Sequence, residues 1–239
     1  MADIFKGVRS ISALLCALVT FAACCFFKIS PIIGSRCSFF SLADALTPLT
    51  GLGGLGLAAL VACTRSGMSI WFLQVPLKAL VYHMPGFFAS AAWAYPNFLL
   101  RVILPLGCMV AFSMHPIGML AIPYTFYWLI PVVIYFSGKK SIFLQALATT
   151  FIAHAVGSVI WLYFKELPVT VWWNLIPVVA AERLLYASLM TSVYYVGSAI
   201  YAGIKMYWKK GGHKRNQLHP SSHKAMADID PSNGSRQNV

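Results

Sequence analysis

Eight side chains in this sequence have the chemistry of a binding pocket for a small polar molecule. They are Arg36, Asp44, His154, Trp172, Trp173, Asn174, Glu182 and Arg183. Charged and amide groups orient a guest through hydrogen bonds, and indole rings offer flat apolar faces beside it. His154, Ser158 and Trp161 also follow one another at helical spacing, so they share one face of a helix. We therefore predict that the eight residues bind a substrate.

Each of these residues also has an ordinary structural explanation. Trp172 and Trp173 fit the aromatic belt of a membrane interface. Asp44 fits an N-terminal helix cap. Glu182 and Arg183 are adjacent and diverge by about 100° around a helix, so we expect each to pair with another helix. A ligand pocket is favoured because all of these groups are expected at one depth and on one side.

No arrangement of residues predicts catalysis or a metal centre. Ser158 and His154 lack a separate base and a shaped oxyanion site, so we expect no enzyme. His83, His115 and His154 are scattered and form no pair at metal-ligand spacing within one apolar stretch. The six cysteines contain no C-x-x-C motif and behave as small hydrophobic residues. We expect neither a metal nor a cofactor.

The composition identifies the class of protein that must position these side chains. The 239 residues are 59% hydrophobic and 10% charged, with a mean hydropathy of +0.73. Soluble domains are about 25% charged and about 45–50% apolar, and a globule of this length could not bury so much apolar surface. The composition argues against a soluble enzyme, a nucleic-acid domain and a secreted disulfide scaffold. It predicts an all-α, polytopic integral membrane helical bundle.

Six apolar stretches predict about six transmembrane helices. They cover about residues 10–27, 44–64, 98–114, 118–136, 141–164 and 177–206. The stretch 66–97 contains three prolines and Lys78, so it is re-entrant, interfacial or an extra crossing. An even number of spans places both termini on one side. Basic residues at the N-terminus, at Arg65 and at Lys139 and Lys140 mark that side as cytoplasmic, in a multi-pass protein of the cell membrane.

Both ends of the chain are basic and account for much of the net charge of +12. Basic flanks beside apolar spans attract anionic lipid headgroups, and we expect no nucleic-acid partner. Residues 209–239 are rich in Ser, Gly, Asn, His and Lys, which predicts a disordered basic cytoplasmic tail after a transmembrane domain of residues 1–208. The first stretch resembles a signal peptide, but its apolar run continues to Phe27. We therefore favour an uncleaved span, with cleavage as the alternative.

Small residues spaced four apart predict close helix packing or docking of a partner. These pairs are Ala13 and Ala17, Gly54 and Ala58, and Ala153 and Gly157. The run from Gly51 to Gly56 also satisfies G-x-G-x-x-G as a string. A nucleotide site would need a preceding strand and an acidic residue about twenty positions later. We expect neither here and assign this run to helix packing.

Three parts of the sequence carry a resemblance to a known family. They are the segment 34–44 (GSRCSFFSLAD) running into Pro48-Leu49-Thr50-Gly51, the small residues Ala13 and Ala17, and the group Trp172, Trp173 and Asn174 before a last helix with a polar start. With its size and helix count, the chain resembles the substrate-binding (S) components of energy-coupling-factor vitamin transporters. The resemblance covers roughly residues 10–207.

The resemblance implies a subunit that captures a small organic molecule such as a vitamin and works with a transmembrane coupling subunit and ATPases. The sequence contains no P-loop, so a separate module would hydrolyse the ATP. Substrate would bind between the first outer loop, the fifth helix and the last helix. The alternative, from another class, is a structural or assembly membrane protein that binds partner subunits without a small-molecule cargo.

Overall fold

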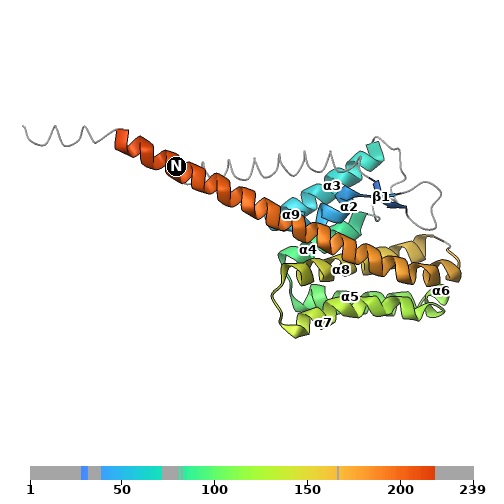
Figure 1. The fold of residues 1–239 in the computed structure, drawn as a ribbon. Coiled ribbons are helices and arrows are strands. Elements are labelled where there is room, and N and C mark those ends of the chain that lie inside the picture. The colour runs from blue at the N-terminus through green and yellow to red at the C-terminus, as the bar shows by residue number, and fades with distance from the viewer. Residues whose placement is uncertain (1–27, 32–38, 72–80, 82, 166, 219–239) are drawn as a thin grey trace, which may run out of the picture. The chain divides into compact units, whose positions relative to one another are not determined.

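The computed structural model describes residues 28–31, 39–71, 81, 83–165 and 167–218. These residues form helices and their connections, apart from a short antiparallel ribbon of β1 (Lys28–Pro31) and β2 (Phe39–Ser41) (Figure 1). The predicted helical class is therefore confirmed, with the ribbon as an addition. The chain divides into two units, residues 1–193 and 194–239. The core and the cavity described below belong to the first unit.

The prediction of one span over residues 44–64 is wrong, because these residues do not form one continuous helix. They form α2 (Leu42–Leu46), the 3₁₀ helix η1 (Thr47–Gly53) and the start of α3 (Leu55–Trp71). The chain turns at Gly54, where φ is +86°, a conformation that residues with a Cβ rarely adopt. The two glycines before Leu55 therefore convert the expected span into a hairpin.

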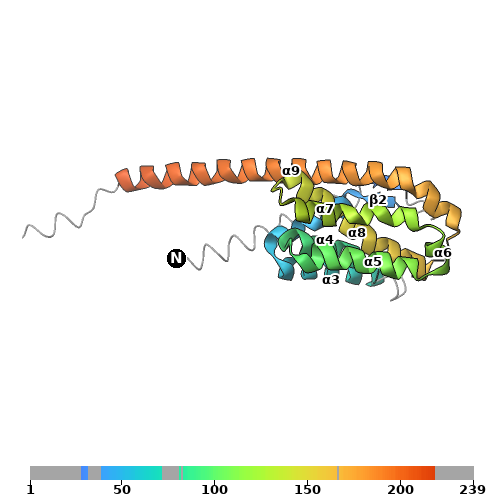
Figure 2. The same cartoon turned by 90° about the horizontal axis from the view of Figure 1, so that it is seen from below.

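Helix α8 is the centre of the bundle and packs against α4, α5 and α7 (Figure 1). The helical segments of this bundle are α4 (Met84–Ala94), the π-helical stretch η3 (Leu99–Ile103), α5 (Leu104–Ser113), α6 (Pro116–Met119), the 3₁₀ helix η4 (Ile122–Trp128), α7 (Leu129–Ser137) and α8 (Ile142–Phe164). The short α6 lies at the end of the bundle, where α5 turns back towards η4 and α7 (Figure 2).

Two of the described helices are long and apolar enough to cross a membrane. They are α8, with 23 residues and a mean hydropathy of 1.6, and the part of α9 (Val169–Leu218) from Val169 to Tyr207, with 39 residues and a mean hydropathy of 1.3. Shorter apolar helices cover Leu55–Gly67, Leu99–Ser113 and Ile122–Ser137. The prediction of about six spans therefore stays a prediction, and its stretch 10–27 lies outside the described residues.

The last helix is longer than the sequence predicts, in both directions. It starts at Val169 rather than at Pro177, which lies inside it, and it continues to Leu218. The first ten residues of the predicted tail, 209–218, continue this helix in the structure, while residues 219–239 lie outside the described residues. A helix that is already formed extends without a new nucleation cost.

An aromatic cluster fixes the start of α9 to the bundle. Phe112 of α5 meets Tyr124, Trp128 and Trp172 with ring centroids 5.7, 5.4 and 5.1 Å apart. All four side chains are buried. Replacing one such ring by alanine typically costs about 3–5 kcal/mol, so this cluster is a main source of stability. It also holds Tyr124 and Trp172 in place for the site described next.

Candidate functional site

A cavity of about 180 Å³ lies in the first unit. Its walls come from the hairpin of α2, η1 and α3, from the start of α4, from η4, from α8 and from the first half of α9. A water molecule takes about 30 Å³ of liquid volume, so the cavity has room for an organic guest. Segments far apart in sequence thus build one site.

The structure brings five of the eight predicted binding residues to this cavity. They are Asp44, His154, Trp172, Glu182 and Arg183. Trp173 and Asn174 are exposed and do not line it, since each successive residue of α9 turns by about 100° away from Trp172. Arg36 lies outside the described residues.

The predicted small-residue pairs take several different positions. Ala153 and Gly157 line the cavity, and a Cβ added at Gly157 would meet Pro85 of α4 at 3.5 Å. Gly54 forms the hairpin turn and has no described atom within 4 Å of such a Cβ, while Ala58 is buried in α3. Ala13 and Ala17 lie outside the described residues.

Gly51 is where the hairpin approaches another helix most closely. A Cβ at this position would collide with the carbonyl oxygen of Ser90 in α4. The Ser90 hydroxyl also donates to the carbonyl of Thr47 at 3.0 Å and lies 3.1 Å from the hydroxyl of Thr50. The glycine-rich run therefore serves packing, as expected, but through Gly51 rather than Gly54.

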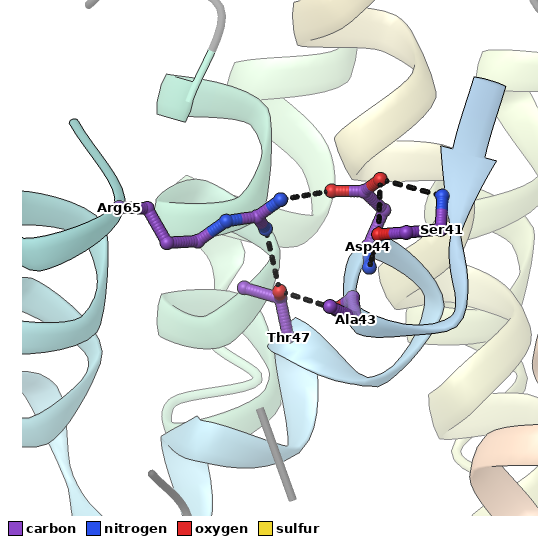
Figure 3. A network of polar contacts seen from close by, with 5 residues as sticks. All are labelled: Ser41, Ala43, Asp44, Thr47 and Arg65. Atoms are coloured by element: carbon purple, nitrogen blue, oxygen red, sulfur yellow. Dashed lines mark hydrogen bonds and ion pairs between the residues drawn. The ribbon is translucent and has the colours of Figure 1, made fainter. Parts of the chain in front are cut away.

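Asp44 takes part in a network that leaves both of its carboxylate oxygens occupied (Figure 3). Oδ2 accepts from the backbone N–H and the hydroxyl of Ser41, both at 2.9 Å. The backbone N–H of Asp44 donates to the Ser41 hydroxyl at 3.3 Å, and the two backbone N–H bonds form a capping box at the start of α2. Oδ1 accepts from Nη2 of Arg65, whose Nη1 donates to the hydroxyl of Thr47 at 2.9 Å. That hydroxyl donates in turn to the carbonyl of Ala43.

The Asp44–Arg65 ion pair corrects the expected position of Arg65. A straight span 44–64 would place Arg65 at the far side of the bilayer from Asp44. The hairpin instead returns α3 past α2, so the guanidinium of Arg65 reaches the carboxylate of Asp44 (Figure 3). Arg65 therefore does not support the predicted orientation.

The same ion pair sets the protonation of two groups at the cavity that lie outside α8 and α9. Burial raises the pKa of Asp44, but the charge and hydrogen bond of Arg65 and the two bonds from Ser41 lower it by more, so the pKa lies below its ordinary value of 3.8. Burial lowers the pKa of His83 below 6.5, and the positive charge of Arg65 adds to this effect. Asp44 is therefore charged and His83 neutral at pH 7.

The second ion pair joins two neighbours on α9. Nη2 of Arg183 lies 3.3 Å from Oε2 of Glu182, and the two side chains are 7% and 14% exposed. The Arg183 guanidinium also lies over the ring of Tyr186, 4.5 Å from its centroid. The expectation that Arg183 pairs with another helix is therefore wrong. Both side chains are long enough to converge although their Cβ atoms diverge.

Two buried donors at the cavity have no acceptor among the described residues. They are Nε of Arg183 and Nε1 of Trp172. Both side chains line the cavity, and the two residues are 6% and 1% exposed. A buried donor without an acceptor is costly, and more so when it carries charge. Arg183 therefore has hydrogen-bonding capacity that the described part of the protein leaves unused.

Tyr124 is a cavity residue that the sequence analysis missed. Its hydroxyl lies 2.8 Å from Nε2 of His154 and 3.0 Å from the hydroxyl of Ser158. It thus connects η4 to the predicted polar face of α8. Tyr124 belongs to an apolar run 30 residues before His154, and no spacing rule relates the two. Only the packing of η4 on α8 brings them together.

The described residues contain no group of three His, Cys, Asp or Glu side chains that could hold a metal ion. Two carboxylates, two guanidiniums, two imidazoles, two tyrosines and two indole rings line the cavity. This set can orient a guest by hydrogen bonds and stacking. A comparison of the chain with protein-family models, with curated proteins and with solved structures gave no match.

Proposed function

We propose that this chain is a multi-pass membrane protein that captures a small organic molecule in the cavity between the hairpin, α8 and α9. A separate ATP-hydrolysing module would drive release of the cargo to the other side, because the sequence has no P-loop of its own. The observation that carries the proposal is the cavity itself. Charged and aromatic groups from five parts of the chain meet there around a space large enough for an organic guest.

Apolar side chains on the surface of the bundle support the membrane part of the proposal. Val110 of α5 and Val133 and Phe136 of α7 are 60%, 65% and 68% exposed. Together with α8 and α9, these helices present apolar side chains where a soluble protein would present polar ones. Lipid chains are the surroundings that suit such a surface, so the bilayer is the first partner that we assign.

The alternative is a membrane protein that holds partner subunits and carries no cargo. The Asp44–Arg65 network favours it in one respect, since a network with both carboxylate oxygens occupied can serve stability alone. In that case the cavity would be a packing defect between helices. The two functions differ in whether a molecule other than lipid occupies the cavity.

Native mass spectrometry of the intact protein, gently extracted and purified without added ligand, tests the proposal. We expect a retained small organic molecule in the unchanged protein and in Trp173→Ala, whose side chain lies outside the cavity. We expect its loss in Glu182→Ala, which shortens a side chain of the cavity wall, while lipid adducts persist. Lipid adducts alone in all three proteins would contradict capture and favour the alternative.

A further inference from the structure

The unused donors of Arg183 give the cavity a chemical preference. A guanidinium has five N–H donors in a fixed plane and no acceptor. Among the described residues, Arg183 makes one ion pair, through Nη2 to Glu182, and its Nε has no acceptor. The ring of Tyr186 lies against one face of the guanidinium and Glu182 lies at Nη2, so its position is set before a guest enters. A guest that brings an acceptor would satisfy this group.

Trp172 adds a second preference of the same kind. Its Nε1–H is a donor without an acceptor among the described residues, and it has no lone pair to offer. Its ring is fixed edge-to-face against Phe112 and Tyr124, with centroids 5.1 and 5.2 Å away. Trp161 of α8 also lines the cavity. Rigid aromatic walls of this kind suit a flat guest.

The pairing of the charges that line the cavity argues against a cationic guest. The two arginines and the two carboxylates that line it cancel formally, and each carboxylate already faces an arginine. A cation would have to displace an arginine from its carboxylate, and it would bring further donors to a site that already has donors in excess. An acceptor oxygen meets neither obstacle.

We propose that the cavity selects planar molecules that carry an acceptor oxygen, a carboxylate or a carbonyl, and that Arg183 receives this oxygen. The inference rests on the proposed function and names the substrate class of the same site. Arg183 is the anchor, Trp172 supplies both a flat wall and a second donor, and Glu182 holds the guanidinium in position. The Asp44–Arg65 pair also lines the cavity, but both oxygens of its carboxylate are already occupied, so we assign it no role in the selection.

Three compounds with the same ring and nearly the same size test whether the cavity prefers an acceptor oxygen to a cation. They are benzoate, benzamide and benzylamine, which carry an anionic acceptor, a neutral acceptor and a cation. Their binding to the full chain in lipid nanodiscs can be measured by saturation-transfer NMR, with protein-free nanodiscs as the blank for partition into lipid. We expect benzoate and benzamide to bind at least about tenfold more tightly than benzylamine, as one charge-assisted hydrogen bond provides. The ratio of the affinities for benzoate and benzamide shows whether a negative charge on the acceptor strengthens binding.

Two conservative variants identify the groups responsible. Arg183→Lys keeps the charge next to Glu182 and removes the planar fork, and Trp172→Phe keeps an aromatic ring and removes the N–H donor. We expect each to weaken benzamide binding about fivefold to tenfold and to leave benzylamine unchanged. Trp173→Phe makes the same chemical change outside the cavity and should have no effect. Trp172→Phe keeps the test available if Arg183→Lys does not fold.

The outcomes separate this inference from the proposed function. If benzylamine binds as well as benzamide, or if neither variant changes benzamide binding, the inference is wrong. Capture of a cargo still stands in that case, provided that a molecule is lost from Glu182→Ala in the mass spectra. If none of the three compounds binds to the folded protein and no molecule is retained on purification, both are wrong.

Discussion

The two ion pairs at the cavity contain the same chemical groups and differ in how fully these groups are used. Asp44 and Arg65 come from α2 and α3, and both oxygens of the carboxylate accept hydrogen bonds. Glu182 and Arg183 are neighbours on α9, 3.3 Å apart, and Nε of Arg183 has no acceptor among the described residues. The first pair is complete as it stands and holds the hairpin. The second has capacity left for a guest.

This difference shows how a structural charge can be told from a binding charge. Both pairs line the same cavity, so position alone does not separate them. Leaving a buried charged donor without an acceptor costs about 1–3 kcal/mol or more, and at a cavity wall a guest that brings an acceptor can recover that cost. The number of hydrogen bonds that each group makes is therefore more informative than its charge or its place in the wall.

The largest effect that we expect comes from Asp44→Asn. Asparagine can still accept from Ser41, but it removes the negative charge that faces Arg65 in a partly buried site. We expect a loss of about 2 kcal/mol in the free energy of unfolding, measured as thermal loss of the monodisperse peak in gel filtration. Binding of benzamide to the molecules that stay folded should not change.

A double-mutant cycle sharpens this prediction. Arg65→Gln alone should cost about as much as Asp44→Asn alone, because each removes the same ion pair. The double variant should then cost clearly less than the sum of the two. Additive losses would mean that the pair does not hold the hairpin, and the comparison between the two pairs would lose its basis.

A smaller effect is expected from Tyr124→Phe, at the polar group between α8 and η4. The change removes the hydroxyl that lies between His154 and Ser158. We expect a loss of about 1–2 kcal/mol in stability, since two buried polar groups lose a partner. Tyr163→Phe is the matched control, because the Tyr163 hydroxyl donates to the carbonyl of Ala111 from an exposed side chain. An equal loss in both variants would argue against a special role for Tyr124.

Arg183→Lys should change stability less than either of these. The lysine ammonium can still face Glu182, and the loss of guanidinium contact with Tyr186 costs about 1 kcal/mol or less. The same thermal measurement, made without any added compound, checks this. A loss as large as that of Asp44→Asn would show that Arg183 holds the fold together, and the distinction between the two pairs would fail.

The smallest effect is a dependence of stability on pH through His83. Its pKa lies below 6.5 because of burial and the nearby charge of Arg65. As pH falls below 6.5, the unfolded chain takes up a proton that the folded protein resists, so stability decreases. Thermal unfolding at pH 7 and pH 5 should therefore differ more for the unchanged protein than for His83→Gln. The reverse order would contradict the assigned direction.

The sequence predicts the regular helices well and the hairpin poorly. The span 141–164 corresponds to α8 (Ile142–Phe164), since a long apolar run with polar residues before and after it has one obvious solution. The span 44–64 is also apolar, but it contains Gly53 and Gly54. Whether such glycines lie inside a helix or form a turn depends on tertiary packing nearby, here the close approach of Gly51 to Ser90 of α4, and hydropathy does not identify that contact.

For the candidate site, too, the sequence predicts which residues matter better than it predicts how they are arranged. Rare polar residues at one expected depth predicted Asp44, His154, Glu182 and Arg183, and these do meet at one cavity. The depth argument could not tell Trp172 from its neighbours, because it ignores which face of α9 meets the bundle. Tyr124 was missed, since a tyrosine in an apolar run is no signal without its tertiary contacts.

The missing side chain of Gly51 has a mechanical consequence. At Gly51 there is no room for even a methyl group against Ser90, and the Ser90 hydroxyl donates to the carbonyl of Thr47. These two contacts oppose sliding of η1 along α4. Asp44 of the hairpin and Pro85 and Gly86 at the start of α4 all line the cavity. We therefore expect the hairpin and α4 to move together, so that a displacement of α4 changes the shape of the cavity.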